Sequence, residues 1–226
     1  MSQPHMTATR RVAIAGATGL VGQHLLEQLL ADETISQVYA LGRREPARRH
    51  PKLTALVVDF AHLPTLPAVD DLYLALGTTI RQAGSQHAFR AVDFEANLAT
   101  AEAAIAACAR RIALVSAAGA NADSRVFYNR TKGELEHALM ALAPDALLIA
   151  RPALLLGDRG ALGQPVRRLE SWSQRLLLRV GHFLPLSWRP IAAEQVARAL
   201  TGTLSTSTGV SILSSTQMQH MPGDAV

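Results

Sequence analysis

The sequence predicts an α/β protein built on one doubly wound parallel sheet. Short apolar runs of strand length alternate along the chain with longer segments whose apolar residues recur at helical spacing. A glycine-rich turn joins the first of these runs to the first helical segment. Five or more strands that alternate with helices are typical of a parallel sheet with helices on both faces.

The first apolar run and the helix after it are the stretch around which the chain is organised. Arg11–Ala15 predicts a buried strand, and the spacing G-x-x-G-x-x-G leads from it into a helix. We expect Gly16 to permit a tight turn, Gly19 to let the backbone approach a pyrophosphate, and Gly22 to let the helix pack closely. The phosphates would lie at the helix N-terminus, where N–H groups favour anions. Glycines of a plain turn are the alternative interpretation.

The later elements continue the alternation of strands and helices. The remaining strands are expected at Gln37–Leu41, Leu53–Val58, Asp71–Leu76, Arg111–Val115, Ala146–Ala150 and Val210–Leu213. The later helices are expected at Ala88–Ala109, Tyr128–Leu142, Arg167–Val180 and Ala193–Leu204. The two ends, residues 1–9 and 215–226, lack periodicity, so we expect them to be loosely ordered.

Length, charge and cysteine content restrict the class of protein. The 226 residues are expected to form one domain. No apolar run reaches the roughly 18 residues of a membrane span, and the first residues contain no apolar signal segment, so we expect a cytoplasmic protein without a membrane partner. The net charge of +4 comes from scattered arginine doublets without a recognition motif, which argues against nucleic acid. Cys108, the only cysteine, lies in an apolar helical pattern and is expected to be buried.

The ends of the second, third and fourth predicted strands suggest how a dinucleotide would be held. Arg43 and Arg44 follow the second strand, where an arginine accommodates a 2′-phosphate and a carboxylate binds the 2′-hydroxyl. Two guanidinium groups therefore favour NADP(H) over NAD(H), although a solvated basic loop is the alternative. Asp59 ends the third strand and is placed to touch the adenine. Gly77 follows the fourth strand and lets the cofactor cross the strand tips.

Tyr128 and Lys132 form the second chemical motif. Residues four apart share one face of a helix, so both side chains can reach one ligand. A neighbouring ammonium lowers the pKa of a tyrosine towards the range useful for proton transfer, and the same lysine can hold the ribose hydroxyls of a nicotinamide nucleotide. The sequence contains only two lysines and three tyrosines, which makes the spacing informative. An exposed tyrosine and a solvated lysine are the alternative.

These motifs, together with Arg151-Pro152 after the sixth strand, resemble the short-chain dehydrogenase/reductase superfamily in its extended or atypical branch. The segments LGTTIRQAGS, YNRTKGELE and RPALLLGDR are similar to the NADPH-binding group that includes the Tat-interacting oxidoreductase proteins. The resemblance, from Arg11 to Leu204, implies a Rossmann fold with Tyr128 as proton donor or acceptor and Lys132 as its partner. It implies cofactor contacts for Thr18, Gly19, Leu20, Val21, Arg43, Arg44, Leu76, Gly77 and Leu155.

One departure from that resemblance concerns the serine that commonly follows the fifth strand and polarises the substrate oxygen. Here the run is Ser116-Ala117-Ala118, and the serine of the family aligns with Ala117 or Ala118. Loss of one such donor costs on the order of 100-fold in rate. Ser116 is a substitute if the loop is shifted, and a strand-end serine that bonds its own backbone is the alternative. Catalysis is thus less secure than cofactor binding.

The substrate side of the protein is expected in a small extension, residues 157–214, beside the cofactor-binding core of residues 10–156. Five of its apolar residues are expected to line the pocket and predict a small apolar substrate, namely Leu162, Trp172, Phe183, Leu184 and Trp188. Three of its arginines are compatible with an anionic substrate instead, namely Arg159, Arg167 and Arg168. The dispersed histidines predict no metal site. The helices Ala88–Ala109 and Tyr128–Leu142 are candidate faces of a homodimer.

Two classes of function remain after these observations. The first is an NADPH-dependent oxidoreductase that moves a hydride between the nicotinamide and a small carbonyl or alcohol, with Tyr128 transferring the proton. The second is a non-enzymatic NADP(H)-binding regulator or scaffold with vestigial catalysis. A sugar-nucleotide epimerase or dehydratase ranks third, because such enzymes usually need a larger C-terminal substrate domain.

Overall fold

A parallel sheet lies at the centre of the computed structural model, which describes residues 9–156 and 189–221. In these ranges the sheet has seven strands in the order β3-β2-β1-β4-β5-β6-β9. The strands are β1 (Arg10–Ala15), β2 (Ile35–Gly42), β3 (Leu53–Val57), β4 (Asp71–Leu74), β5 (Arg111–Val115), β6 (Ala146–Arg151) and β9 (Gly209–Ser214). The short strands β7 (Leu155–Leu156) and β8 (Ile191–Ala192) pair separately.

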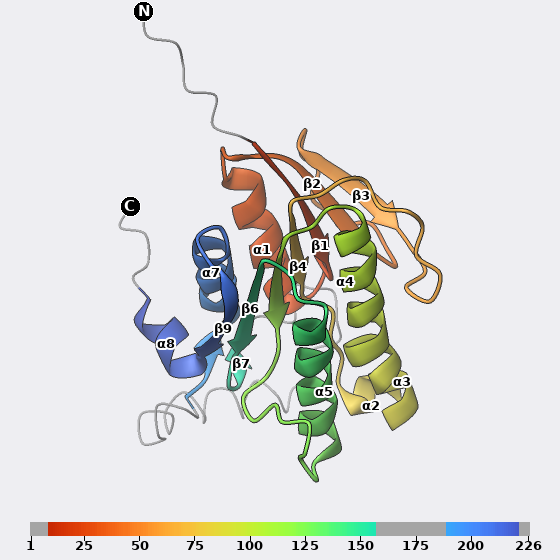
Figure 1. Ribbon diagram of the computed structural model, residues 1–226, viewed down its shortest axis with the longest axis vertical. Helices are drawn as coiled ribbons and strands as arrows, with labels where there is room; N and C mark the ends of the chain where they lie inside the picture. Colours follow the sequence, from red (N-terminus) through yellow and green to blue (C-terminus); the bar gives the residue numbers. More distant parts are fainter. Residues whose placement is uncertain (1–8, 157–188, 222–226) are drawn as a thin grey trace, which may run out of the picture.

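Helices cover both faces of this sheet, as Figure 1 shows. On one side lie α1 (Leu20–Ala31), α7 (Ala193–Leu204) and α8 (Ser215–His220). On the other side lie α4 (Asn97–Ala106) and α5 (Phe127–Ala141), preceded by α2 (Ile80–Ala83), α3 (Gln86–Arg90) and the π-helix η1 (Ala91–Ala96). The predicted class, a doubly wound parallel α/β sheet, is confirmed. Both α7 and β9, which lie in the expected extension, join this core.

Strand β1 shows why the central strands read as continuous apolar runs. Val12 and Ile14 face the helices α1 and α7, whereas Ala13 and Ala15 belong to the apolar layer under α4 and α5. Successive side chains of a strand point to opposite faces, and here both faces are covered. A strand that is buried on both faces has no polar alternation.

Asp71 is a buried carboxylate at the amino ends of three neighbouring strands. Its Oδ2 accepts a hydrogen bond from Arg10 Nη1 at 2.7 Å, and its Oδ1 accepts one from Arg111 Nε at 2.6 Å. A buried charge is costly unless it is paired and hydrogen-bonded. Arg10 and Arg111, two members of the scattered arginine doublets, therefore stabilise the junction of β1, β4 and β5.

The helical segment expected at Ala88–Ala109 differs from the prediction in two ways. It contains η1, and its α-helix ends at Ala106. Cys108 is exposed with a φ of 76°, so the expectation of a buried cysteine is wrong. The reason is local: the chain leaves the helix before Cys108, whose N–H bonds to the carbonyl of Ile105 at 2.9 Å, and then turns into β5.

The segment after β9 is also more ordered than expected. Ser214 caps α8, because its side chain accepts from Gln217 N while the Gln217 side chain accepts from Ser214 N. Such a capping box satisfies backbone donors at both positions, and Met218 of this helix is fully buried. The expectation of a loosely ordered end is therefore wrong for Ser215–His220. The helix expected at Arg167–Val180 lies outside the described residues.

Candidate functional site

The glycine turn between β1 and α1 forms one wall of the site. Gly16 has a φ of 92°, and a Cβ at this position would lie 2.5 Å from the carbonyl oxygen of Ala75. A Cβ at Gly22 would lie 2.0 Å from the carbonyl oxygen of Gly16. Both distances are shorter than any van der Waals contact, so each position requires glycine. The expected roles of Gly16 in the turn and of Gly22 in close helix packing are confirmed.

The N-terminus of α1 is open to an anion. Gly19 is the N-cap residue and provides no side-chain cap, and the first turn contains no acidic residue. The first N–H groups of a helix have no partner inside the helix, and no carboxylate opposes a phosphate here. Thr18 is exposed, Leu20 is half-buried and Val21 is buried. The approach of a pyrophosphate to Gly19 stays a prediction.

The tips of β2 and β3 lie side by side at the same edge of the sheet. The N–H of Val58 donates to the carbonyl of Gly42 at 3.0 Å, which brings Arg43 and Arg44 next to the start of the loop that contains Asp59. Both arginines are exposed. Asp59 is also exposed and accepts from the N–H of Ala61 at 3.0 Å, and this bond together with His62 lowers the pKa of its carboxyl group. Contacts of these residues with a cofactor stay a prediction.

Two polar residues that the sequence analysis missed lie behind the tip of β4. Asn97 Nδ2 donates to the carbonyl of Leu76 at 3.3 Å, and Asp93 Oδ2 accepts from the N–H of Thr78 at 2.8 Å. Asp93 and Asn97 are both buried, and they flank the predicted cofactor residues Leu76 and Gly77. The sequence carried only a weak signal for them, because the same segment contains other polar side chains such as Arg90, Glu95 and Glu102.

Tyr128 and Lys132 lie together on the buried face of α5. Lys132 Nζ lies 2.7 Å from Asp93 Oδ1, and the ring of Tyr128 packs against that of Phe89 with centroids 5.5 Å apart. Burial raises the pKa of Tyr128; Lys132 lowers it and Asp93 raises it further. The expected lowering by the lysine is present, but burial outweighs it, so the pKa of Tyr128 lies above its usual value and not nearer neutrality. The alternative of a solvated lysine is excluded, since the Lys132 side chain is only 5% exposed.

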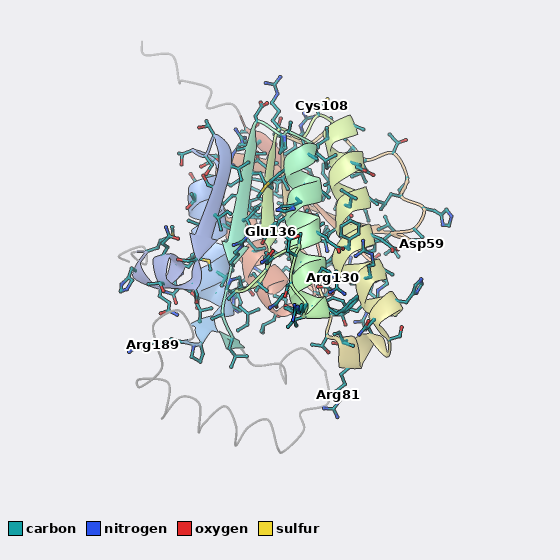
Figure 2. All side chains as sticks on the ribbon, turned by 60° about the horizontal axis from the view of Figure 1, so that its bottom comes forward. Asp59, Arg81, Cys108, Arg130, Glu136 and Arg189 are labelled. Carbon is teal, nitrogen blue, oxygen red and sulfur yellow. The ribbon has the colours of Figure 1, made fainter. Side chains whose placement is uncertain are left out.

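Ser116 belongs to a second buried polar group. Its hydroxyl donates to Glu136 Oε1, and Arg151 donates to the same carboxylate through Nε at 3.0 Å and through Nη2. Glu136 lies between α5 and the sheet in Figure 2. Ser116 therefore bonds neither its own backbone nor open solvent, but a carboxylate two turns beyond Tyr128 on the same helix. Arg151 could be recognised from the sequence, whereas no sequence motif pointed to Glu136. A catalytic role for Ser116 stays a prediction.

The remaining predicted residues are only partly placed. Leu155 lies in β7, half-buried, and pairs with Ile191. The apolar and basic residues expected to line the substrate pocket, from Arg159 to Trp188, lie outside the described residues. Over the ranges 9–156 and 189–221, no three histidine, cysteine, aspartate or glutamate residues are placed to hold a metal ion.

A glycine turn, an uncapped helix N-terminus and a Tyr-Lys pair at the carboxyl edge of a parallel sheet define an NAD(P)-binding protein. Residues 16–150 match the family described as NAD(P)H-binding, and the chain belongs to this family. Protein FMP52, mitochondrial, of Candida albicans is 34% identical over 197 residues, which cover 82% of this chain and 83% of the relative. Protein fmp52, mitochondrial, of Aspergillus fumigatus is 37% identical over 158 residues, 66% of this chain and 68% of the relative.

Solved structures share the fold at low sequence identity. An oxidoreductase of the short chain dehydrogenase/reductase family from Burkholderia thailandensis has a TM-score of 0.66 at 22% identity and covers 91% of this chain and 90% of its own. MoeE5 in complex with UDP-glucose and NAD has a TM-score of 0.63 at 19% identity, with coverages of 90% and 76%. UDP-N-acetylglucosamine 4-epimerase from Methanobrevibacter ruminantium has a TM-score of 0.68 at 14% identity, with coverages of 91% and 76%. The resemblance to the short-chain dehydrogenase/reductase superfamily is confirmed as a likeness of fold.

The names of the relatives correct the expected location. Relatives from Emericella nidulans and Eremothecium gossypii are also called mitochondrial, and this contradicts the expectation of a cytoplasmic protein. That expectation was based on the lack of an apolar signal segment, a feature of secretion, whereas mitochondrial targeting depends on amphipathic segments. Within the described part of the chain, none of the helices has the length and apolar character needed to cross a membrane.

Proposed function

We propose that the protein is an NADP(H)-dependent oxidoreductase that transfers a hydride between the nicotinamide and a small, mainly apolar carbonyl or alcohol substrate. The observation that carries the proposal is the buried Lys132 ammonium on the same helix face as Tyr128, in an NAD(P)-binding fold. The bound nicotinamide supplies or accepts the hydride. Tyr128 donates a proton to the carbonyl oxygen in reduction and accepts it in oxidation.

The residues present fit the dinucleotide. The uncapped N-terminus of α1 provides backbone N–H donors for a phosphate. Gly16 and Gly22, where a Cβ has no room, let the turn and the helix pack closely enough to present these donors. Lys132 is the cation available for the nicotinamide ribose hydroxyls. A side chain at Gly77 would lie 3.5 Å from Asp93 Oδ1 and 4.0 Å from Lys132 Nζ, so glycine at this position keeps the approach to the lysine open.

A preference for NADP(H) over NAD(H) is part of the proposal. Arg43 and Arg44 are exposed directly after β2, and the strand end carries no carboxylate before Glu45. A guanidinium matches the geometry of a phosphate with two parallel hydrogen bonds. The pair therefore suits the 2′-phosphate that distinguishes NADP(H).

A second function, an NADP(H)-binding regulator without turnover, is favoured by one observation. The Ser116 hydroxyl donates to the buried Glu136, and the next two residues are alanines. The hydroxyl that would polarise a substrate carbonyl is therefore engaged elsewhere, which is the feature expected of a site that has lost catalysis.

One experiment separates the two functions. The purified protein is mixed with NADPH and a panel of aldehydes, ketones and quinones, and NADPH absorbance is followed, while cofactor affinity is measured by calorimetry. Turnover that requires Tyr128 supports the oxidoreductase. Tight NADPH binding without turnover on any member of the panel supports the regulator.

A further inference from the structure

Two contacts join α5 to the neighbouring segment of α3 and η1, and on each side the two contacting residues are four positions apart. Phe89 and Asp93 lie four apart on α3 and η1, and Tyr128 and Lys132 lie four apart on α5. The rings of Phe89 and Tyr128 have centroids 5.5 Å apart, and Asp93 Oδ1 lies 2.7 Å from Lys132 Nζ. The packing that places the ring of Tyr128 against that of Phe89 therefore also places a carboxylate against the ammonium beside it.

Asp93 is held in place from two directions. Its side chain is 1% exposed, and Oδ2 accepts from the N–H of Thr78 at the tip of β4. Apart from the ion pair with Lys132, Oδ1 has no hydrogen-bond partner in the described ranges. Oδ2 thus fixes the carboxylate to the segment that follows β4, and Oδ1 contacts the lysine.

The backbone around Asp93 is unusual. Asp93 lies in η1, a π-helix of six residues, and such segments are rare and frequent at functional sites. Asn97 Nδ2 donates to the carbonyls of Val92 at 3.1 Å and of Asp93 at 3.3 Å, so a buried amide stabilises the widened turn. The chain maintains a less common helix geometry at the point where it presents this carboxylate.

We propose that Asp93 is a positioning residue that holds the Lys132 ammonium and offsets its charge, so that Tyr128 keeps its proton at neutral pH. The consequence for catalysis, that Tyr128 acts as an acid in reduction, rests on the proposed function. An unpaired ammonium stabilises phenolate, whereas an ammonium in contact with a carboxylate does so much less. The raised pKa of Tyr128 agrees with this balance.

Three other charged groups of the packed elements lie close together. Arg90 of α3 donates to Glu134 of α5, and Arg130 Nε lies 4.0 Å from the other oxygen of Glu134. These two guanidinium groups and one carboxylate carry a net charge of one positive unit, which Asp93→Asn leaves unchanged. Lys132 on its own helix and Asp93 on η1 are the groups whose charges act on the Tyr128 hydroxyl.

The test is a titration of Tyr128 in the protein without cofactor. The chain has three tyrosines, so the phenolate of Tyr128 must be separated from the other two. The unaltered protein and each Asp93 variant are therefore titrated twice, once with Tyr128 and once with Tyr128→Phe. The difference in absorbance between the two titrations belongs to Tyr128. A rapid pH jump records the absorbance before alkaline unfolding. Asp93→Asn is expected to move the Tyr128 transition down by about one pH unit or more. Asp93→Glu, which keeps a carboxylate, is expected to stay closer to the unaltered protein.

A matched control removes a different charge from the same segment. Glu95 also lies in η1 but is exposed, so Glu95→Gln is expected to leave the Tyr128 transition in place. If Asp93→Asn does not fold by circular dichroism, Asp93→Ser, which leaves room for water beside Lys132, is expected to give the same downward shift. A transition that stays in place or moves up in the folded variant overturns the inference.

The same variants distinguish this inference from the proposed function. In an active protein, the loss of reductase turnover at high pH is expected to occur at lower pH in Asp93→Asn. A shifted titration in a protein that turns over no substrate supports the role of Asp93 and counts against the oxidoreductase. Turnover that requires Tyr128, combined with an unshifted titration, overturns the role of Asp93 alone.

Discussion

Arg151 Nε donates to Glu136 Oε1 over 3.0 Å and so joins the end of β6 to the middle of α5. The two side chains differ in exposure to solvent, since that of Glu136 is 1% exposed and that of Arg151 is 32% exposed. Ser116, at the end of β5, donates to the same carboxylate. One buried charge therefore connects two strand ends to the helix that carries Tyr128 and Lys132.

This difference in exposure predicts that substitutions of Glu136 and of Arg151 affect stability by different amounts. Arg151→Met leaves Glu136 buried without its cation and is expected to lower the free energy of unfolding by about 3–5 kcal/mol. Glu136→Gln is expected to cost less, because Arg151 can reach water and the amide oxygen can still accept from Ser116. Denaturant unfolding of both variants measures the difference. Equal losses would show that burial of Glu136 does not dominate the energetics of the pair.

Gly22→Ala is expected to destabilise the protein and to weaken NADPH binding. The new Cβ would lie 2.0 Å from the carbonyl oxygen of Gly16, so α1 must move away from the turn that approaches the phosphate. The matched control is Gly202→Ala in α7, where nothing lies within 4 Å of the added atom. That variant is expected to stabilise by about 0.5–1 kcal/mol, because alanine loses less backbone entropy in a helix. Thermal unfolding and calorimetry with NADPH check both variants.

Replacing Arg43 and Arg44 together by alanine is expected to weaken NADPH binding much more than NADH binding. Each charge-assisted contact with the 2′-phosphate contributes roughly 1.5–3 kcal/mol. The control replaces Arg48 and Arg49, which are exposed on the same loop further along the chain, and should change the ratio of the two affinities little. Equal loss for both nucleotides in the Arg43/Arg44 variant would argue against recognition of the 2′-phosphate.

Tyr128→Phe is expected to reduce turnover by roughly 100-fold or more with little change in cofactor affinity, since it removes the proton-transferring hydroxyl and keeps the ring. Lys132→Ala is expected to harm both, and Lys132→Arg should not restore them, because a planar guanidinium does not reproduce a compact ammonium. Thermal unfolding is measured first for each variant. Full reductase turnover by Tyr128→Phe would redirect the search for the proton donor to Ser116 or to a bound water.

The sequence by itself determined the alternation of strands and helices, the glycine turn and the Tyr128–Lys132 pair. Each of these is local, because periodicity, a fixed spacing or a turn residue can be read within about 20 positions. The roles of Gly16 and Gly22 followed from the same reasoning, since a strand followed at once by a helix requires a tight turn. For this reason the fold and the family could be predicted without coordinates.

Only the tertiary structure decided which side chains stand next to the pair. Asp93 contacts Lys132, which lies 39 positions further along the sequence. Glu136 accepts hydrogen bonds from Ser116 and Arg151, which lie at the ends of two different strands. Sequence spacing does not predict such contacts, because they depend on how the helices pack on the sheet. They also depend on the π-helix η1, which the periodicity of the sequence did not indicate. The same packing partly buries Tyr128 and raises its pKa, although the neighbouring lysine alone predicts the opposite direction.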